Sequence, residues 1–529
     1  MSHELDYLSR CVAAGRLSRR EFLGRATALG VSATFANSLL AGAAKAQAPR
    51  KGGILKAGLE GGAATDSLDP AALGSGIPIV FSKSWGELLV ATTSDGGIEY
   101  RIAEEIGASK DVSTWTMKIR KGVQFHNGKE VTPQDVVASL ERHATEESQS
   151  GALGIMRGIE SLKADGSNVV VTLKEPNADL PYLMTDYHLI IQPNGGKDDP
   201  AAGISAGPYK VTVNEPGVRH GGEKFKDYWQ GDKVGHADQI EIIVINDGTA
   251  RMATLQSNQV HMINSVEPRT IDLLKRVPGM TIQNISGPSY TSFNMFCDIA
   301  PFDNNDLRMA LKLAMDREEM VDKIVRGYGT IGNDFPINEA YALFPDDIEQ
   351  RVFDPDKAKF HYKKSGHSGP ILLRTSETSF TGAVGAVQLY QQSCAKAGIS
   401  IEVKREPSDG YMSEVWNKQP FSTVTWNGRA TQDQVYSTVY LSTAPWNDTH
   451  FHNDKFDKLL IEARAEFDRD KRKNLYREMA IILRDEGGAI VPMFNQWIDA
   501  TGPGVKGFVK DPAFSMSNGY ALAKCWLEA

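Results

Sequence analysis

Residues 114–143, TWTMKIRKGVQFHNGKEVTPQDVVASLERH, carry the signals of a strand and a turn, followed by a helix. Trp115, Met117 and Ile119 alternate with polar residues at the period of two that buries one face of a β-strand. The Asn-Gly pair at 127–128 tolerates positive φ and predicts a reversal of the chain. We therefore expect a half-buried strand that ends in a turn.

The helix after this turn has a clear start. Thr132 is a suitable N-cap, Pro133 suits the first helical position, and Asp135 lies near the positive end of the helix dipole. Val136, Val137 and Leu140 then supply the buried stripe. The whole segment is therefore expected to form a strand, a turn and a helix.

This segment resembles the signature of the family 5 solute-binding proteins of ABC importers, a group that binds peptides, opines and nickel chelates. Similar blocks follow along nearly all of the chain: Lys51–Pro70, Gly207–Gly231, Asn294–Gly327 and Phe456–Pro492. The resemblance implies an α/β chain with the type II periplasmic binding protein fold of cluster C, in which two lobes and an additional subdomain leave a cleft between the lobes.

The same resemblance implies the division into lobes. Lobe I would combine residues 50–288 with 496–529 and would contain an inserted subdomain at about residues 85–200. Lobe II would take residues 289–495. Two crossings, near 290–294 and 491–495, would form the hinge at which the lobes close around a solute.

Local patterns predict further elements. Val169–Leu173, Tyr209–Val213 and Ile240–Ile245 read as strands, as do Ile371–Leu373 and the alternating residues from Ile399 to Val403. Helical spacing predicts helices at Arg251–Gln256, Asp306–Val325, Ala383–Ala397 and Lys471–Asp485, with residues 304–306 as candidate caps for the second.

The amino terminus predicts export. Residues 18–24, SRREFLG, match the twin-arginine (Tat) pattern, and a modestly apolar run follows from Ala26 to Leu40. Cleavage is possible after Ala46 or Ala48, and we favour Ala46, giving a signal peptide of residues 1–46, because Pro49 is a poor residue just after a cut. We expect a soluble, Tat-exported protein in the periplasm of a Gram-negative bacterium.

Charge and composition narrow the function. The 529 residues carry a net charge of −8, which becomes −11 without residues 1–46, because those hold six Lys/Arg and three Asp/Glu. An acidic protein of this kind is a poor partner for nucleic acid or an anionic membrane. Cys297, Cys394 and Cys525 have no metal-ligand spacing and are expected as buried thiols, although one disulfide stays possible. No cofactor and no metal are expected.

The sequence contains one possible catalytic motif and one possible metal-binding motif, and the evidence for each is weak. Residues 203–207, GISAG, fit the G-x-S-x-G nucleophile elbow, but Pro208 and a strand pattern follow Ser205 where that elbow requires a helix. His450 and His452 with Asp454 lie in a polar loop and are better explained as surface residues.

Two loops are candidate walls of the ligand site. The resemblance places the loop that begins at Glu60 at the cleft. The stretch 374–382, RTSETSFTG, connects a predicted strand to a helix, a place where α/β lobes bind small polar or anionic groups. Ser376, Thr378 and Thr381 are therefore site candidates, although helix capping alone is an alternative explanation.

The most discriminating stretch is 426–429, Trp-Asn-Gly-Arg. Peptide-binding members of the family carry W-x-x-D here, and the Asp meets the α-ammonium of the ligand. Arg429 replaces that Asp, and a guanidinium only donates hydrogen bonds and pairs best with anions. The alternative is that Arg429 pairs with an internal acid, of which Asp433 is the nearest in sequence.

Aromatic residues complete the candidate site. Trp426 is expected to stack on the ligand and Asn427 to line the site, whereas Trp416 and Trp446 are expected in the core. The resemblance then implies a monomeric, non-enzymatic protein that captures a small organic solute and delivers it to the transmembrane subunits of an ABC permease.

The solute class follows from Arg429, which favours a carboxylated peptide, opine or amino-acid conjugate. An oligosaccharide or a metal chelate bound by the same fold is an alternative. An exported hydrolase is a weaker one, because no nucleophile and base are found, and a sensory or chaperone-like role is a third.

Overall fold

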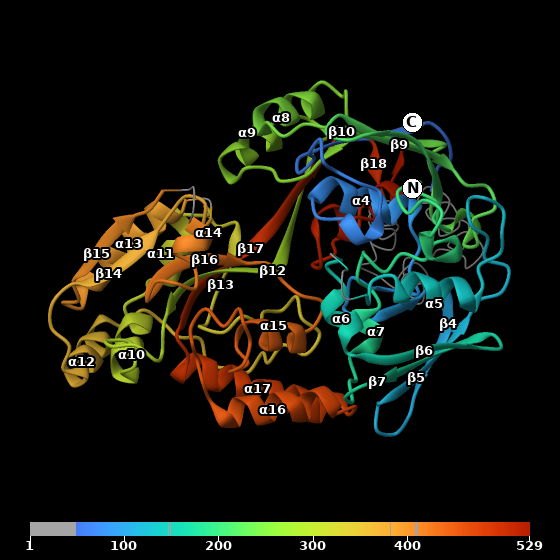
Figure 1. Cartoon of the computed structure of the whole chain (residues 1–529). Helices are drawn as coiled ribbons and strands as arrows, with labels where there is room; N and C mark the ends of the chain where they lie inside the picture. Colours follow the sequence, from blue (N-terminus) through green and yellow to red (C-terminus); the bar gives the residue numbers. More distant parts are fainter. Residues whose placement is uncertain (1–48, 146–147, 149, 381, 408–410, 529) are drawn as a thin grey trace, which may run out of the picture.

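The computed structural model of the chain describes residues 49–528 except 146–147, 149, 381 and 408–410 (Figure 1). The expected export signal and its two candidate cleavage positions lie outside the described residues. Among the described residues, no helix combines the length and the apolar character that crossing a membrane requires.

Residues 114–141 adopt the expected strand and helix. Strand β5 (Thr114–Ile119) buries Trp115, Met117 and Ile119. Helix α5 (Pro133–Glu141) begins with a capping box, in which the Thr132 hydroxyl accepts from the Asp135 backbone N–H at 3.2 Å and the Asp135 carboxylate accepts from the Thr132 N–H at 2.9 Å. The prediction for this segment is confirmed.

Strand β5 belongs to a small antiparallel sheet with the order β4-β5-β7-β6. Helix α5 packs on β6 and β7, and the short helices α6 and α7 lie beside this sheet (Figure 1). These elements fall within residues 85–200, the range expected for the inserted subdomain: β2 (Val90–Thr92), β3 (Ile98–Tyr100), β4 (Ala103–Ala108), α6 (Leu153–Arg157), β6 (Ile159–Asp165), β7 (Asn168–Leu173) and α7 (Leu180–Leu183).

A second, larger sheet runs through the whole molecule. Its strand order is β15-β14-β16-β12-β17-β11-β1-β10-β9-β8, and β13 pairs with β17 beside this path. The strands are β1 (Ile54–Leu59), β8 (Tyr209–Glu215), β9 (Arg219–Lys224), β10 (Gln239–Val244), β11 (Met262–Ile263), β12 (Thr281–Met295), β13 (Gly329–Ile331), β14 (Ile371–Thr375), β15 (Ile401–Arg405), β16 (Phe421–Trp426) and β17 (Ala489–Thr501). The strand expectations above correspond to β7, β8, β10, β14 and β15, with ends shifted by up to two residues.

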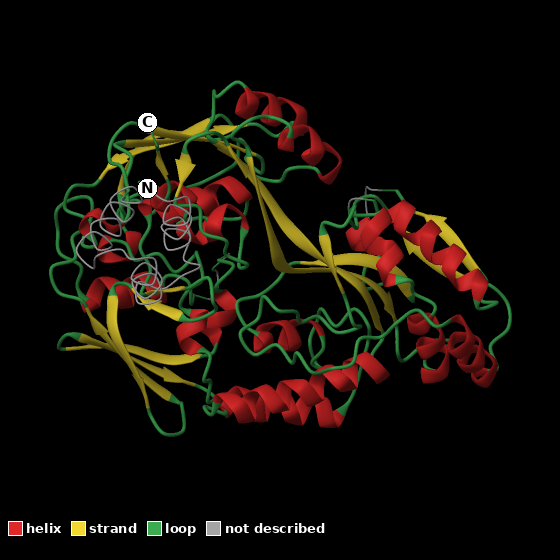
Figure 2. Cartoon of the chain, turned by 180° about the vertical axis from the view of Figure 1, so that it is seen from behind, coloured by secondary structure: helices red, strands yellow, loops and turns green. Residues whose placement is uncertain are grey.

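Strands β12 and β17 join the two lobes (Figure 2). They pair antiparallel from Thr281 opposite Thr501 to Asn294 opposite Ala489, and the register breaks between Ser286 and Tyr290. We propose that the lobes exchange near this break, at residues 288–289 and 495–496, because an irregular register is a natural point of bending.

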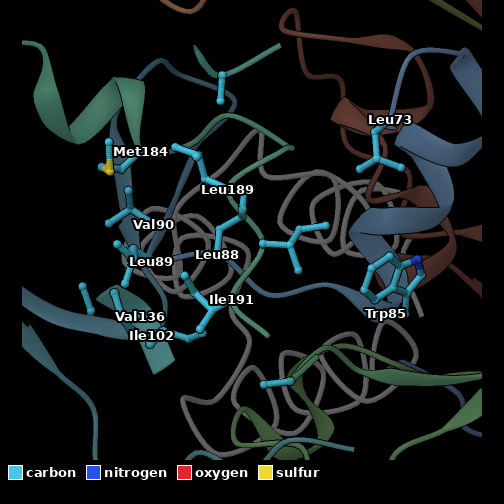
Figure 3. Packing of buried hydrophobic residues seen from close by; sticks show 14 of the residues in the cluster. Leu73, Trp85, Leu88, Leu89, Val90, Ile102, Val136, Met184, Leu189 and Ile191 are labelled. Atoms are coloured by element: carbon cyan, nitrogen blue, oxygen red, sulfur yellow. The ribbon is translucent and has the colours of Figure 1, made fainter. Parts of the chain in front are cut away.

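The buried hydrophobic residues separate in the same way. One large cluster draws on residues 55–262 and 516–525 in lobe I, and Figure 3 shows part of it, including Trp85, Val136 and Ile191. Two other clusters draw only on residues 290–494 in lobe II. Each lobe therefore has its own hydrophobic core, as expected for a chain of this length.

Helices cover both lobes. In lobe I these are α4 (Gly76–Trp85), α8 (Gly248–Gln256), α9 (Ile271–Lys275), α18 (Ser515–Asn518) and α19 (Ala521–Lys524), the last two followed by β19 (Trp526–Leu527), which pairs with β18 (Val505–Lys506). In lobe II they are α10 (Asn305–Leu313), α11 (Arg317–Lys323), α12 (Pro355–Ser365), α13 (Ala383–Lys396), α14 (Tyr411–Glu414), α15 (Gln432–Val439), α16 (Asp454–Ala465) and α17 (Arg469–Glu486).

One helix prediction was wrong in its extent. The expected helix over 306–325 is two helices, α10 and α11, which break at residues 314–316. Asp316 leaves the helical conformation, and its side chain accepts from the Glu319 backbone N–H at 3.0 Å, so it caps a new helix. Asn304 caps α10, as one of the three candidates.

A buried carboxylate ties lobe II to strand β17. Asp334 is fully buried, pairs with Arg317 and with Arg351 (2.9 Å), and accepts from the Val491 backbone N–H at 3.1 Å. Burial alone would raise the pKa of Asp334, but the charges of Arg317, Arg351 and Lys312 lower it below the ordinary value of an aspartate. Asp334 therefore remains charged and holds the side chains of Arg317 and Arg351 next to strand β17.

Replacing Asp334 with Asn is expected to lower the free energy of unfolding of lobe II by about 3–5 kcal/mol, because two buried guanidinium groups lose their counter-charge. Chemical denaturation measures the effect. Since the folded pKa is lowered, the stabilisation by Asp334 is lost as the pH falls through that pKa.

The control is Asp346→Asn, which removes a carboxylate that is 75% exposed and pairs with Lys473 on the surface. Its effect is expected to stay within about 0.5 kcal/mol. Equal stability losses for the two variants would contradict a structural role for the Asp334 pairs.

Candidate functional site

Two of the loops singled out in the sequence lie at the same edge of the lobe II sheet. Strands β14 and β16 are parallel, with Arg374 opposite Ser422, so the loops that follow them emerge side by side. The Thr423 hydroxyl hydrogen-bonds the Thr375 hydroxyl at 2.9 Å and the Ser379 hydroxyl at 2.8 Å. The loop after β14 is therefore attached to the strand that leads to Arg429.

The loop after β16 places Arg429 in a defined position. Its backbone N–H donates to the Tyr341 hydroxyl at 3.1 Å, and its Nη1 donates to the carbonyls of Asn427 (3.1 Å) and Gly428 (3.2 Å). A Cβ at Gly428 would lie 2.2 Å from Pro288 Cγ, so only glycine fits against the hinge strand here. Within the described chain, Arg429 Nε and Nη2 have no hydrogen-bond partner.

Arg429 also lies near the opposite lobe. Burial raises the pKa of Tyr187, in the inserted subdomain, to about 12, and the charge of Arg429 acts on this hydroxyl in the opposite direction. The Tyr187 ring packs on His188 at 4.2 Å, and His188 Nε2 lies 3.0 Å from the Leu73 carbonyl. Gly428, the residue before Arg429, adjoins Pro288 of β12, so the loop that carries Arg429 lies beside one of the strands that join the lobes.

The alternative prediction, that Arg429 pairs with Asp433, is wrong. Asp433 is 6% exposed and pairs with Arg464 of α16 at 3.0 Å rather than with Arg429. Burial raises the pKa of Asp433, and the Arg464 charge opposes that rise. Arg429 forms no ion pair with any acid in the part of the chain that the structure describes.

Three tryptophans form a cluster beside this loop. The ring centroids of Trp416, Trp426 and Trp446 lie 5.9–6.2 Å apart. The indole N–H groups of Trp416 (2.8 Å) and Trp426 (3.0 Å) both donate to the Asp448 carboxylate. Burial raises the pKa of Asp448 to about 6, although these two donors favour the charged form.

The exposure of these tryptophans differs from expectation. Trp426, proposed to stack on ligand, is 7% exposed and already uses its N–H, so it offers little free surface. Trp446, expected in the core, is 50% exposed, because it lies on the outer side of the other two rings. The cluster thus supports the Arg429 loop, and Trp446 is its accessible ring.

The remaining candidate residues differ in solvent exposure and in their position in the fold. Asn427 and Thr378 are exposed, and Ser376 is buried. Thr381 lies outside the described residues, and α13 is capped by Gly382 without a side-chain hydrogen bond. Glu60 pairs with Arg251 at 2.9 Å and belongs to lobe I, so no contact with the lobe II candidates is seen.

Two surface pockets, each of about 710 Å³, lie away from these residues. One is a basic hollow between the subdomain and the rest of lobe I, and the other lies along β15 and α13. Neither contains a predicted site residue.

The motifs set aside in the sequence have structural explanations. The Ser205 hydroxyl is fully buried and donates to the Ile191 carbonyl at 2.6 Å, so it is unavailable as a nucleophile. His450 stacks on Phe296 at 3.8 Å and pairs with Asp298 at 3.0 Å. No cluster of metal ligands occurs among the described residues.

The three cysteines of the described chain are free thiols. Cys394 and Cys525 are buried, as expected, and burial raises the pKa of each to about 12. Cys297 is only half-buried, which corrects the expectation for this residue.

Sequence reasoning missed Tyr341, Tyr187 and Asp448. Each acts over a large separation in the chain: Tyr341 lies 88 residues from Arg429, and Asp448 lies 22 residues from Trp426. No local spacing marks these pairs. Buried indole groups do require acceptors, which is the one general signal that could have prompted a search for a residue such as Asp448.

Comparison with known proteins supports the same fold. The chain is 23% identical to the dipeptide-binding protein of Escherichia coli (strain K12), over 78% of this chain and 83% of that protein. It is 26% identical to heme-binding protein A of Haemophilus influenzae, over 78% of this chain and 82% of that protein.

A solved structure of the binding protein AgaA from A. tumefaciens R10, in complex with agropinic acid, has a TM-score of 0.73 at 22% identity and covers 90% of this chain and 99% of that chain. This likeness confirms the expected two-lobe type II fold. Residues 97–448 match the bacterial extracellular solute-binding proteins, family 5 Middle. That match spans more than half of the sequence, and the chain belongs to the family 5 bacterial extracellular solute-binding proteins.

Proposed function

We propose that this protein captures a small organic anion, most simply a carboxylated peptide, opine or amino-acid conjugate, and delivers it to the transmembrane subunits of an ABC permease. The observation that carries the proposal is Arg429. Its loop adjoins Pro288 of β12, and its guanidinium forms no ion pair with a described residue and has Nε and Nη2 free to donate.

The chemistry of this group suits a carboxylate. Nε and one Nη form a planar fork that matches the two oxygens of a carboxylate, and each charge-assisted hydrogen bond is stronger than a neutral one. Because Nη1 is held by the carbonyls of Asn427 and Gly428, the fork is oriented before the solute arrives. Little side-chain entropy is then lost on binding.

The ligands of related proteins are compatible with this reading. The dipeptide-binding protein and heme-binding protein A are named for molecules that carry a carboxylate, and the AgaA structure is a complex with agropinic acid, which carries one too. A solute that contacts Arg429 on one lobe and the Tyr187 region on the other would favour the closed state. We further propose that the protein acts as a monomer, since one chain supplies both lobes.

We also propose that residues 1–46 direct export to the periplasm through the Tat system. The twin arginines, Arg19 and Arg20, and the weakly apolar run after them support this route.

A fusion of residues 1–48 to a folded reporter is expected to be exported only when the Tat system is intact. Changing Arg19 and Arg20 together to Lys is expected to abolish export, measured by cell fractionation. The matched control changes Arg16 and Arg25 to Lys and is expected to leave export intact. Continued export of the first variant would overturn the assignment.

Replacing Arg429 with Ala is expected to weaken solute binding by roughly 10- to 150-fold, because a hydrogen bond to a charged group contributes about 1.5–3 kcal/mol. The solute is the one that co-purifies with the protein, identified by native mass spectrometry and measured by calorimetry. Arg429→Asp is expected to bind still more weakly, since an added carboxylate repels the anion.

The control is Arg276→Ala, an exposed arginine at the end of α9 in lobe I. This variant is expected to bind as the unaltered protein does. Binding by Arg429→Ala within about twofold of that value, or a solute without an anionic group, would refute the role of Arg429.

A further inference from the structure

The inserted subdomain of lobe I touches lobe II at a second place besides the hinge. At the start of α7, the Ala178 backbone N–H donates to the Arg464 carbonyl at 2.9 Å, and Asp179 pairs with Arg472 at 2.6 Å. The side chains of Asp179 and Arg472 are 5% and 8% exposed. Figures 1 and 2 show α16 and α17 reaching from lobe II to this subdomain, below the strands that join the lobes.

A smaller contact lies beside this pair. In the turn between β2 and β3, Gly96 meets Ala342 of lobe II so closely that a Cβ at Gly96 would lie 3.1 Å from Ala342 Cβ. The Gly96 carbonyl accepts from the Tyr182 hydroxyl at 3.2 Å, and the Ala342 carbonyl accepts from Arg469 at 2.9 Å. Each side of this contact is therefore fixed by a hydrogen bond within its own lobe.

Both contacts connect to the Arg429 loop. Arg464, whose carbonyl accepts from Ala178, also pairs with Asp433 in the first turn of α15. Ala342 directly follows Tyr341, the hydroxyl of which accepts from the Arg429 N–H at 3.1 Å. A chain of direct contacts therefore joins the lobe boundary to the candidate site.

We propose that these contacts form an interlobe clasp, consisting of Asp179 with Arg472, Ala178 with Arg464, and Gly96 with Ala342, which forms when the lobes close and must break when they open. Asp179 and Arg472 belong to different lobes, so rotation about β12 and β17 separates them. This inference rests on the proposed function. The clasp affects the free-energy difference between the open and closed states, and part of the solute's binding free energy is used to shift that equilibrium toward closure.

The sign of the effect follows from desolvation. In the closed state the attraction between the two charges is largely offset by the loss of their hydration, so the pair leaves opening and closing finely balanced. Removing only the carboxylate leaves Arg472 buried without a counter-charge, and this favours the open state, in which water hydrates the guanidinium. Replacing both residues with apolar ones removes that penalty and favours closure.

The test traps the closed state in the absence of solute. Gly96→Cys and Ala342→Cys are introduced together, and the rate at which a disulfide joins them under mild oxidation is measured, with peptide mapping to separate it from the three native thiols. In this background, Asp179→Asn is expected to slow cross-linking by roughly tenfold or more. Asp179→Leu combined with Arg472→Met is expected to cross-link at least as fast as the parent.

The matched control is Glu175→Gln, which removes a nearby carboxylate that is 78% exposed and 3.8 Å from Arg464. It is expected to cross-link at the parental rate. Small-angle scattering of Asp179→Asn with Gly96 and Ala342 intact provides a second readout, in which the radius of gyration is expected to rise.

Cross-linking of Asp179→Asn within twofold of the parent, together with an unchanged radius of gyration, would overturn the clasp. Because both measurements are made without solute, their outcome is independent of what the protein binds. Failure of Arg429→Ala to weaken binding would instead count against the proposed function alone.

Discussion

The antiparallel pairing of β12 with β17 is the constraint on which the rest of the molecule depends. Two strands of 15 and 13 residues carry one continuous sheet from lobe I into lobe II, so neither lobe is independent of the other. Where the register breaks between Ser286 and Tyr290, Pro288 packs against Gly428. This register break therefore directly adjoins the loop that carries Arg429.

Around that point, the structure combines rigid support with an unpaired charge. Asp448 and the tryptophan cluster fix the end of β16, and Tyr341 fixes the backbone of Arg429. Asp433, the acid nearest to this arginine in sequence, is committed to Arg464. An arginine that is oriented by its own backbone and has no acidic partner among the described residues suits the anion-binding role proposed for it.

Local patterns in the sequence were sufficient for much of the fold. The alternation at Trp115, Met117 and Ile119 and the cap at Thr132 were read correctly, because both signals depend only on neighbouring residues. The break between α10 and α11 was missed, since Asp316 is compatible with a surface position in a continuous helix until its capping bond is seen. For the site, the unusual Arg429 could be found from its place in the motif.

Its surroundings could not be found in this way. Trp446, Asp448 and Arg464 reach the site through turns and helices whose placement depends on tertiary packing. The hydrogen-bond partners of Asp448 and Arg464 lie 22–32 residues away in sequence, and no periodic pattern spans such distances. Charge pairing is equally hidden, because Asp433, the acid nearest to Arg429 in sequence, pairs instead with Arg464 of α16.

The most direct test of the account is a crystal structure of the protein purified gently from the cells that produce it, with the solute still bound. The account predicts a solute enclosed between the lobes, with an anionic group within hydrogen-bond distance of Arg429 Nε and Nη2. Density for a solute that lies elsewhere, or that presents no anion to Arg429, would contradict it.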